Sequence, residues 1–443
     1  MNKIREVLVA VVLLFSIPAI GQVTTLSPYS LFGIGDLRPQ LNTAQWSMGG
    51  LGATFQDGYQ VNNFNPASLP YLRMSNLQLG MDYRMLKITG PKVTEPVSNN
   101  IAEFTYLGLA FPINDWWSTS INLSPFSSIG YDIRTVEEDP NFGQTAYKFS
   151  GKGGLNRVSW SNGFMILDGL SIGASADYIF GTNSQSSDVI FDNSNYLNFK
   201  SSQEQTYSTF QFNAGLQYAY HFNDTAFLTI GVVASPSQTL NGTFKRADYT
   251  YVINTVNGTD IPVDTSYYIP GRDGGIRLPD RFTIGLNYGH YIEQMGGAAW
   301  QIGGEFTMGK WSSFEDFDGN NPYNDSWRAA VGGSITPRFV FPSAKRSNSV
   351  FADAAIRLGG YYANTQIEQR GQQVVDMGAT FGLSIPFRPR NLAPGENKLN
   401  FFNIGIVVGQ RGNSNLGIIQ EDYVNLIFGV SFSDEWFQKF KYR

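Results

Sequence analysis

Segments of about ten residues that alternate apolar and polar side chains recur along most of this 443-residue chain. In LQLGMDYRM, residues 77–85, every odd-numbered position is apolar and every even-numbered position is polar or glycine. The same period of two appears in residues 210–220, 282–288 and 424–432. Because successive side chains of a strand point to opposite faces, these segments predict strands with one apolar and one polar face.

The beginning of the chain restricts where such strands can fold. Residues 1–21 combine two basic residues with the apolar run VLVAVVLLFSIPAI and end in the small residues Ala19 and Gly21, which predicts a secretory signal peptide. Beyond it there is no apolar run of about 18 residues, as a membrane-spanning helix requires. A spanning chain without such helices must close its strands into a barrel. A soluble half-buried sheet also alternates, but the combination predicts an all-β, transmembrane antiparallel β-barrel in the outer membrane of a Gram-negative cell.

Marking every alternating segment gives fourteen strands, an even number, as a barrel with both ends in the periplasm requires. The predicted strands are 75–88, 101–111, 117–134, 146–163, 168–182, 205–222, 225–245, 279–290, 299–312, 326–337, 350–367, 372–387, 398–411 and 421–433. Long and short connections alternate in the middle of the chain, which places long loops outside and short turns in the periplasm. We expect the barrel to span 75–433, residues 434–443 to form a periplasmic tail, and 246–278 to form a long outer loop.

Residues 22–74 alternate poorly and contain many glycines and prolines, which predicts a plug inside the lumen rather than strands. A disordered N-terminal tail is the alternative, but the stretches SLFGI, GGLGATF and ASLPYL are too apolar for solvated disorder. In GYQVNNFNPASLPY, residues 58–71, we expect the asparagines to satisfy backbone groups where no strand ladder exists. Pro66 and Pro70 would stiffen the passage from the plug to the first strand.

Composition excludes several functional classes. The signal peptide carries two of the 31 Lys and Arg residues and one of the 36 Asp and Glu residues, so the remainder is mildly acidic and no nucleic-acid partner is predicted. With no cysteine and two histidines, the chain offers no thiolate metal site and no serine–histidine pair, so we predict no metal, no cofactor and no enzymatic activity. The acidic stretch 314–325 lacks the ligand spacing of a calcium loop and is expected to be a solvated hairpin tip.

Two groups of wall residues are candidates for function. Pro125 lies inside the third predicted strand although proline cannot donate to a ladder, so Pro125, Phe126 and Gly130 predict a kink or gap in the wall, with a harmless β-bulge as the alternative. Charged residues with a predicted lumen-facing side chain form the second group. They are Asp82, Arg84, Asp177, Arg281, Glu305, Arg328, Asp353 and Arg357. These charges can pair across the lumen, or an inward arginine can receive a ligand carboxylate.

Three blocks of sequence carry a family resemblance. They are GGLGATFQDGYQVNNFNPASL (49–69), LGLAFPINDWWSTSINLSPFSSIG (107–130) and LPDRFTIGLNYGHYIEQMGGAAWQIGGEFTMGKWSSF (278–314), and together they cover roughly a quarter of the chain. In their order and spacing they resemble the FadL-type outer-membrane transporters of long-chain fatty acids and aromatic hydrocarbons. The first block resembles that family's small-residue segment, which ends in Asn-Pro-Ala.

The resemblance implies a fourteen-stranded barrel closed by an N-terminal hatch that includes Asn65, Pro66, Ala67 and Pro70. Such a barrel takes up a hydrophobic small molecule, a fatty acid or a related compound, from outside. A change in the hatch then releases the ligand, and a lateral gap lets it leave into the outer-membrane lipid. Some FadL-like barrels of the type IX secretion system instead resemble scaffolds or shuttles, so a periplasmic or secreted protein is the alternative partner.

Overall fold

The computed structural model describes residues 27–91, 95–193, 195–254, 256–292, 297–341, 350–387 and 398–435. The predicted signal peptide and nearly all of the predicted periplasmic tail lie outside these ranges. No helix within them is long and apolar enough to cross a membrane.

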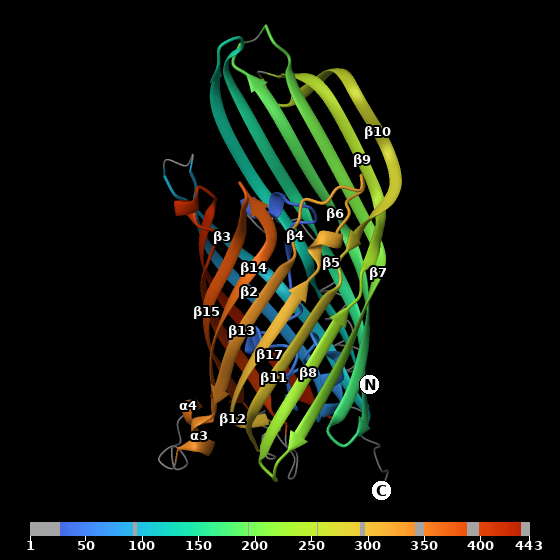
Figure 1. Cartoon of the computed structure of the whole chain (residues 1–443), viewed down its shortest axis with the longest axis vertical. Coiled ribbons are helices and arrows are strands. Elements are labelled where there is room, and N and C mark those ends of the chain that lie inside the picture. Colours follow the sequence, from blue (N-terminus) through green and yellow to red (C-terminus); the bar gives the residue numbers. More distant parts are fainter. Residues whose placement is uncertain are drawn as a thin grey trace.

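Within the described residues, fourteen strands close into an antiparallel barrel (Figure 1). Its wall consists of β2 (Ser75–Thr89), β3 (Val97–Asn114), β4 (Trp117–Asp139), β5 (Gly143–Leu167), β6 (Leu170–Phe191), β7 (Asn198–His221), β8 (Ala226–Ser235), β11 (Arg281–Ile292), β12 (Gly297–Gly309), β13 (Ser326–Ile335), β14 (Ala355–Gln369), β15 (Gln372–Phe387), β16 (Asn400–Arg411) and β17 (Gln420–Asp434). The last strand pairs with the first, from Gln420 opposite Thr89 to Asp434 opposite Ser75, so the wall closes on itself.

The alternation of the sequence places apolar side chains on the outside of this wall. Leu79, Phe212 and Ile302 are 41%, 57% and 58% exposed, whereas inward neighbours such as Gln78 and Gln211 are buried. An exposed apolar band on a closed barrel is the surface that the lipid of an outer membrane covers. The predicted fold class, including the number of strands, is confirmed.

A group of strands continues well beyond the membrane-spanning wall. The hairpin of β9 (Gln238–Ile253) and β10 (Asp260–Leu278) pairs with the first half of β7 and, with the long β4, β5 and β6, forms a curved sheet above the barrel (Figure 1). The predicted outer loop at 246–278 is therefore wrong, and so is the single strand at 225–245, which breaks after Ser235. Most of β10 is exposed on both faces, so its sequence carries no apolar alternation by which a strand could be recognised.

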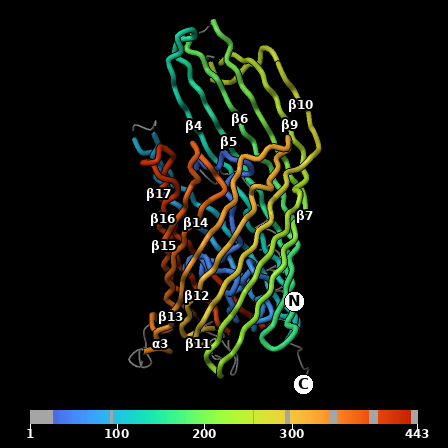
Figure 2. Tube along the Cα trace, viewed as in Figure 1, coloured from blue at the N-terminus to red at the C-terminus, as the bar shows by residue number. Residues whose placement is uncertain are grey.

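The N-terminal residues 27–74, which we call the inner segment, lie inside the barrel and appear blue within the strands in Figure 2. The inner segment contains η1 (Pro28–Leu31), β1 (Asp36–Leu37), α2 (Thr43–Trp46) and η2 (Pro66–Tyr71). Asn42 and Gln45 form a capping box at the start of α2, which satisfies backbone groups that have no ladder partner. Most of the residues from 41 to 69 are buried.

Short helical turns lie at the periplasmic end and in two loops. They are α3 (Pro337–Val340), α4 (Val350–Asp353), η4 (Trp311–Ser313) and η6 (Ser414–Leu416). Asp353 ends α4 and forms an ion pair with Arg338 of α3, so its predicted position in the lumen is wrong. The strand predicted at 350–367 begins only at Ala355, because the residues before it turn as a helix outside the wall.

Candidate functional site

Glycines of the wall allow the inner segment to lie directly against the strands. A Cβ atom added at any of nine wall glycines would come within 3.0 Å of an atom of the inner segment, so a larger residue there would force that segment to shift. We call this set the glycine collar. It consists of Gly163, Gly173, Gly215, Gly231, Gly332, Gly359, Gly382, Gly405 and Gly429, each from a different strand. The collar surrounds residues 43–67 of the inner segment at one level of the lumen.

The residues that resemble the family's hatch lie at this collar. The Asn65 side chain accepts a hydrogen bond from the Ala67 N–H at 3.1 Å and donates to the Ala53 carbonyl at 2.7 Å, and Asn65 is fully buried. Pro66 begins η2 and Pro70 lies within it, and η2 packs against β4, β5, β6 and β7. The structure therefore brings Asn65, Pro66, Ala67 and Pro70 together inside the lumen, and their function as a hatch stays a prediction.

Two of the predicted lumen charges bind the backbone of the inner segment. Glu305 Oε2 accepts hydrogen bonds from the N–H groups of Gly52 and Ala53, at 2.8 and 2.7 Å. Arg328 donates to the Gly49 carbonyl and lies over the ring of Tyr361, 4.6 Å from its centroid. Since buried backbone groups need partners, these two side chains hold the stretch 49–53, which forms no ladder of its own.

Three of the other predicted lumen charges are arginines that bond to neighbouring strands of the wall. Arg84 donates to Asn425 at 3.1 Å, Arg281 donates to Ser235 at 3.4 Å, and Arg357 donates to Ser384. Each of these bonds joins neighbouring strands of the wall, so the four predicted arginines do not form one cluster. Of the four, Arg84 and Arg328 border an internal cavity.

This cavity has a volume of about 330 Å³ and lies between the wall and residues 36–46 of the inner segment. Apolar side chains, including Leu41, Trp46, Tyr106 and Trp327, form part of its lining. Uncharged polar and charged side chains form the rest. The charged ones are Asp36, Asp82, Glu103, Asp376, Glu421, Arg38, Arg84, Arg328 and Arg411. Among the described residues, no group of three His, Cys, Asp or Glu side chains is placed to hold a metal ion.

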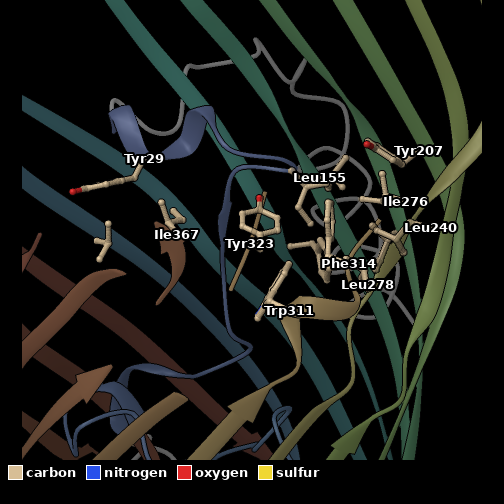
Figure 3. Packing of buried hydrophobic residues seen from close by; sticks show 14 of the residues in the cluster. Tyr29, Leu155, Tyr207, Leu240, Ile276, Leu278, Trp311, Phe314, Tyr323 and Ile367 are labelled. Atoms are coloured by element: carbon tan, nitrogen blue, oxygen red, sulfur yellow. The ribbon is translucent and has the colours of Figure 1, made fainter. Parts of the chain in front are cut away.

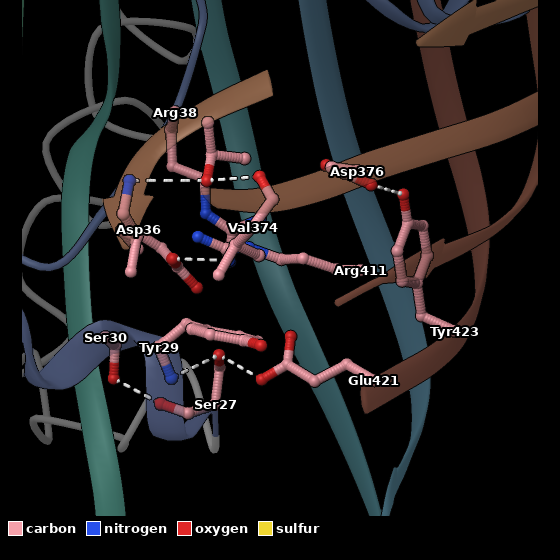
Figure 4. Close-up of polar contacts among 12 residues, drawn as sticks. Ser27, Tyr29, Ser30, Asp36, Arg38, Val374, Asp376, Arg411, Glu421 and Tyr423 are labelled. Carbon is pink, nitrogen blue, oxygen red and sulfur yellow. Dashed lines mark hydrogen bonds and ion pairs between the residues drawn. The ribbon is translucent and has the colours of Figure 1, made fainter. Parts of the chain in front are cut away.

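Ion pairs beside the cavity tie the start of the inner segment to the wall (Figure 4). Arg411 of β16 binds Asp36 at 2.7 Å, as Figure 4 shows. Glu103 of β3 binds Arg38 at 3.0 Å. The hydroxyl of Ser27 donates to Glu421 of β17. Sequence reasoning missed Glu103, Arg411 and Glu421. The period of two could have placed them on the lumen face, but it contains no sign of partners 65 to 394 residues away.

The loop between β12 and β13 folds into the outer mouth of the barrel. Trp311, Phe314 and Tyr323 are buried in one apolar cluster with Tyr29 of the inner segment and with wall residues such as Leu155 (Figure 3). The prediction of a solvated hairpin tip at 314–325 is therefore wrong for the aromatic residues, although Glu315 and Asp318 are exposed. We call residues 311–323 the outer lid.

A hydrogen bond fixes the end of the outer lid. The Ser312 N–H donates to Asp325 Oδ1 at 2.8 Å, and this bond to the charged carboxylate holds the pKa of Asp325 below its usual value. The lid and the collar lie at different levels of the lumen, because the lid contacts η1 at Tyr29 whereas the collar begins at Thr43. Aromatic packing thus covers the extracellular side of the barrel interior.

The pairing of β3 with β4 ends partway along both strands. The last β3–β4 pair toward the extracellular side is Leu107 opposite Leu123, while β4 continues to pair with β5 as far as Asp139. The β4–β5 register shifts between Pro125 and Ser127, so Phe126 is the extra residue of a β-bulge. The bulge that the sequence left as one alternative is present, at the place where two wall strands stop pairing.

Above this place, the inner segment pairs with β4 in place of β3. Asp36 and Leu37 of β1 lie opposite Ser128 and Ser127, and the Arg38 N–H donates to the Phe126 carbonyl at 2.9 Å. The Ser30 hydroxyl donates to the Gly130 carbonyl at 3.2 Å and accepts from its N–H at 3.1 Å. Pro125 borders the cavity. The structure thus places Pro125, Phe126 and Gly130 together along one edge that β1 and η1 cover.

Comparison with solved structures identifies the same fold in bacterial channels. The Pseudomonas putida toluene transporter TodX is 16% identical, with a TM-score of 0.55 over 91% of this chain and 100% of that chain. The Ralstonia pickettii toluene transporter TbuX is 15% identical, with a TM-score of 0.53 over 91% and 99% of the two chains. A Pseudomonas aeruginosa FadL homologue is 15% identical, with a TM-score of 0.53 over 90% and 98%. The predicted resemblance to FadL-type barrels is confirmed.

No curated protein matches the sequence. A family model does match it, over residues 3–443, and that model is described as BamG. The match includes the inner segment, all fourteen wall strands and the extracellular hairpin, so it applies to the whole barrel and everything inside it. The chain therefore belongs to the BamG family.

Proposed function

We propose that this protein is an outer-membrane channel that takes up hydrophobic small molecules from outside and releases them sideways into the lipid. One observation carries the proposal: the internal cavity borders Pro125, where β3 and β4 stop pairing. A cavity that meets the wall at a break in its ladder gives an apolar molecule a path that avoids the periplasm. The fold shared with the toluene transporters TodX and TbuX supports the same function.

The proposed route has three steps. A ligand first separates the aromatic side chains of the outer lid, among them Trp311 and Phe314, from the apolar cluster. It then enters the cavity, where Leu41 and Trp46 offer apolar contacts. Finally β1 leaves the edge of β4, and the ligand passes between β3 and β4 into the outer leaflet. In this route the inner segment is the hatch, and its residues at the collar stay in place while β1 moves.

That the substrate is a fatty acid remains a prediction. Its carboxylate would need a cation at the cavity, and Arg84 and Arg328 are the predicted arginines that lie there. Both already have partners, since Arg84 donates to Asn425 and Arg328 donates to Gly49. The residues that line the cavity therefore support a hydrophobic ligand more strongly than they support a ligand with a carboxylate head group.

Closing the lateral route with a disulfide tests the proposal. The chain contains no cysteine, so Thr105→Cys with Pro125→Cys adds one pair, at two cavity-lining positions beyond the last β3–β4 pair. We expect oxidation of this pair to stop uptake of a neutral apolar probe by proteoliposomes, and a reductant to restore it. The matched control is Leu109→Cys with Ile121→Cys, which joins the same strands within their ladder. Unchanged uptake through the fully oxidised Thr105–Pro125 pair would contradict the lateral route.

A scaffold or shuttle for a secreted or periplasmic protein is the second candidate function. The curved extracellular sheet favours it, because Val263, Tyr267 and Tyr268 of β10 are 54%, 51% and 65% exposed in a strand outside the membrane. Exposed apolar and aromatic side chains are common at protein interfaces. Removing residues 240–276 distinguishes the two functions: loss of a stoichiometric protein partner supports the scaffold, while unimpaired binding of that partner opposes it.

A further inference from the structure

We infer that the internal cavity receives the cationic head of an amphiphile at Asp82, and that this head competes with Arg38 for the carboxylates of the wall. The inference rests on the proposed function, because it names the substrate class of the same cavity. It concerns the head group, whereas the proposed function concerns the path of the apolar part.

Asp82 of β2 is a buried carboxylate with an unused acceptor. The residue is 7% exposed, it lines the cavity, and its Oδ1 has no hydrogen-bond partner among the described residues. Burying a carboxylate costs free energy unless it is paired and hydrogen-bonded. A buried carboxylate oxygen without a partner, in a residue that lines a cavity, would therefore be stabilised by a cation or hydrogen-bond donor that reaches it.

A second carboxylate lies directly beside Asp82. Glu103 of β3 is its register partner across the ladder, and both side chains are buried on the lumen face. Like charges directly opposite each other on neighbouring strands destabilise the pair. The inner segment supplies one cation, Arg38, whose Nη2 lies 3.0 Å from Glu103 Oε1. Arg84 also interacts electrostatically with both carboxylates. Across the whole cavity lining the acidic residues outnumber the arginines by one, so a further cation would reduce the repulsion.

The remaining charges around the cavity favour a cation over an anion. The lining contains five acidic residues and four arginines. Arg411 is paired with Asp36 at 2.7 Å, Arg328 is bonded to Gly49 and stacked on Tyr361, and Arg84 is bonded to Asn425. The Nε atom of Arg411 also lacks a hydrogen-bond partner, so the preference for a cationic head rests on the excess of one carboxylate in the lining and on the unpartnered Asp82 Oδ1.

The position of Asp82 links binding of the amphiphile's head to the proposed exit between β3 and β4. Apolar side chains that include Leu37, Leu86 and Tyr106 line the same cavity, which extends to Pro125, so a tail attached to a head at Asp82 lies toward the break in the wall. Arg38 follows β1 directly in the sequence. A ligand cation that replaces Arg38 at Glu103 therefore removes an ion pair that ties the end of β1 to β3.

Binding of three amphiphiles of equal chain length to the purified full-length barrel tests the inference. The probes are dodecylammonium, dodecanoate and dodecanol, measured by calorimetry at neutral pH in a nonionic detergent. We expect dodecylammonium to bind about tenfold more tightly than the other two, as a charge-assisted hydrogen bond to a buried carboxylate provides. Asp82→Asn should abolish that preference and leave dodecanol binding unchanged.

Two further variants separate a binding role from a structural one. Asp177→Asn is the matched control, because Asp177 is also a buried lumen carboxylate, on β6, but does not border the cavity, and it should leave all three affinities unchanged. Arg38→Ala should tighten dodecylammonium binding, since it removes the competing cation. A merely structural role of Asp82 predicts no such gain. Heat-modifiable electrophoretic mobility confirms that each variant is folded.

The outcomes distinguish this inference from the proposed function. Tighter binding of dodecanoate, or equal binding of all three probes with no effect of Asp82→Asn, would overturn the cationic site while dodecanol binding still supports a hydrophobic channel. Failure of all three probes to bind would overturn both. Preferential binding of dodecylammonium that depends on Asp82 supports the inference.

Discussion

At the scale of single residues, the glycine collar explains how an irregular segment can fill a barrel without leaving voids. Wall glycines let backbone meet backbone, and Glu305 and Arg328 satisfy groups of the inner segment that no ladder satisfies. The inner segment is thus held by a few directional bonds and by close fit. Both features make single substitutions informative.

Gly173→Val tests the fit at the collar. A side chain there would overlap Pro66 and Ala67, so we expect overpacking of about 1–3 kcal/mol and displacement of η2. Limited proteolysis of the folded barrel should then cleave the inner segment faster than in the wild type. Gly304→Val is the control, because a Cβ atom there meets only the Ala330 carbonyl, at 3.6 Å. Equal cleavage of the two variants would contradict the collar.

Glu305→Ala tests the bonds that hold the inner segment. The substitution leaves the N–H groups of Gly52 and Ala53 without their acceptor, at a cost of about 1–3 kcal/mol for each buried donor. Hydrogen exchange at residues 52 and 53 should accelerate, while Glu305→Gln, which keeps an acceptor oxygen, should have a smaller effect. Unaltered exchange in Glu305→Ala would show that other contacts hold this stretch.

At the scale of elements, the sequence pattern predicts the strands that face lipid but not the strands that lie in water outside the membrane. Strands with one face in lipid alternate strictly, so the period of two located all fourteen wall strands. Most of β10 in the β9–β10 hairpin is exposed on both faces and carries no such period, so the sequence pattern predicts a loop there. Alternation likewise found Glu305 and Arg328 but not their partners, because nothing local connects Arg328 with Gly49, 279 residues away. Asp353 was misplaced because a helical turn interrupts the pattern.

The strand ladders of the wall do not depend on the inner segment. All fourteen wall ladders close without a contribution from the inner segment, whose one strand pairing is β1 with β4. Deletion of residues 22–70 should therefore leave a folded barrel that leaks small solutes. Heat-modifiable mobility reports folding and liposome swelling reports leakage. A deletion variant that fails to assemble would show that the segment is part of the structural core.

At the scale of the whole molecule, the barrel is closed by different means at its two levels. Aromatic packing of the outer lid covers the extracellular mouth, and the collar holds the rest of the inner segment below it. Between them lies a cavity that reaches the wall where β3 and β4 separate. On the proposed route, β1 is the one element that must move for a ligand to leave the cavity sideways.

Locking β1 to β4 tests this central claim most directly. Leu37→Cys with Ser127→Cys introduces a disulfide between two register partners in a chain that has no other cysteine. With the lock oxidised, we predict that a neutral apolar probe still binds the purified barrel but that its transfer into liposome lipid stops, and that a reductant restores the transfer. Transfer at the wild-type rate through a fully oxidised lock would contradict the account.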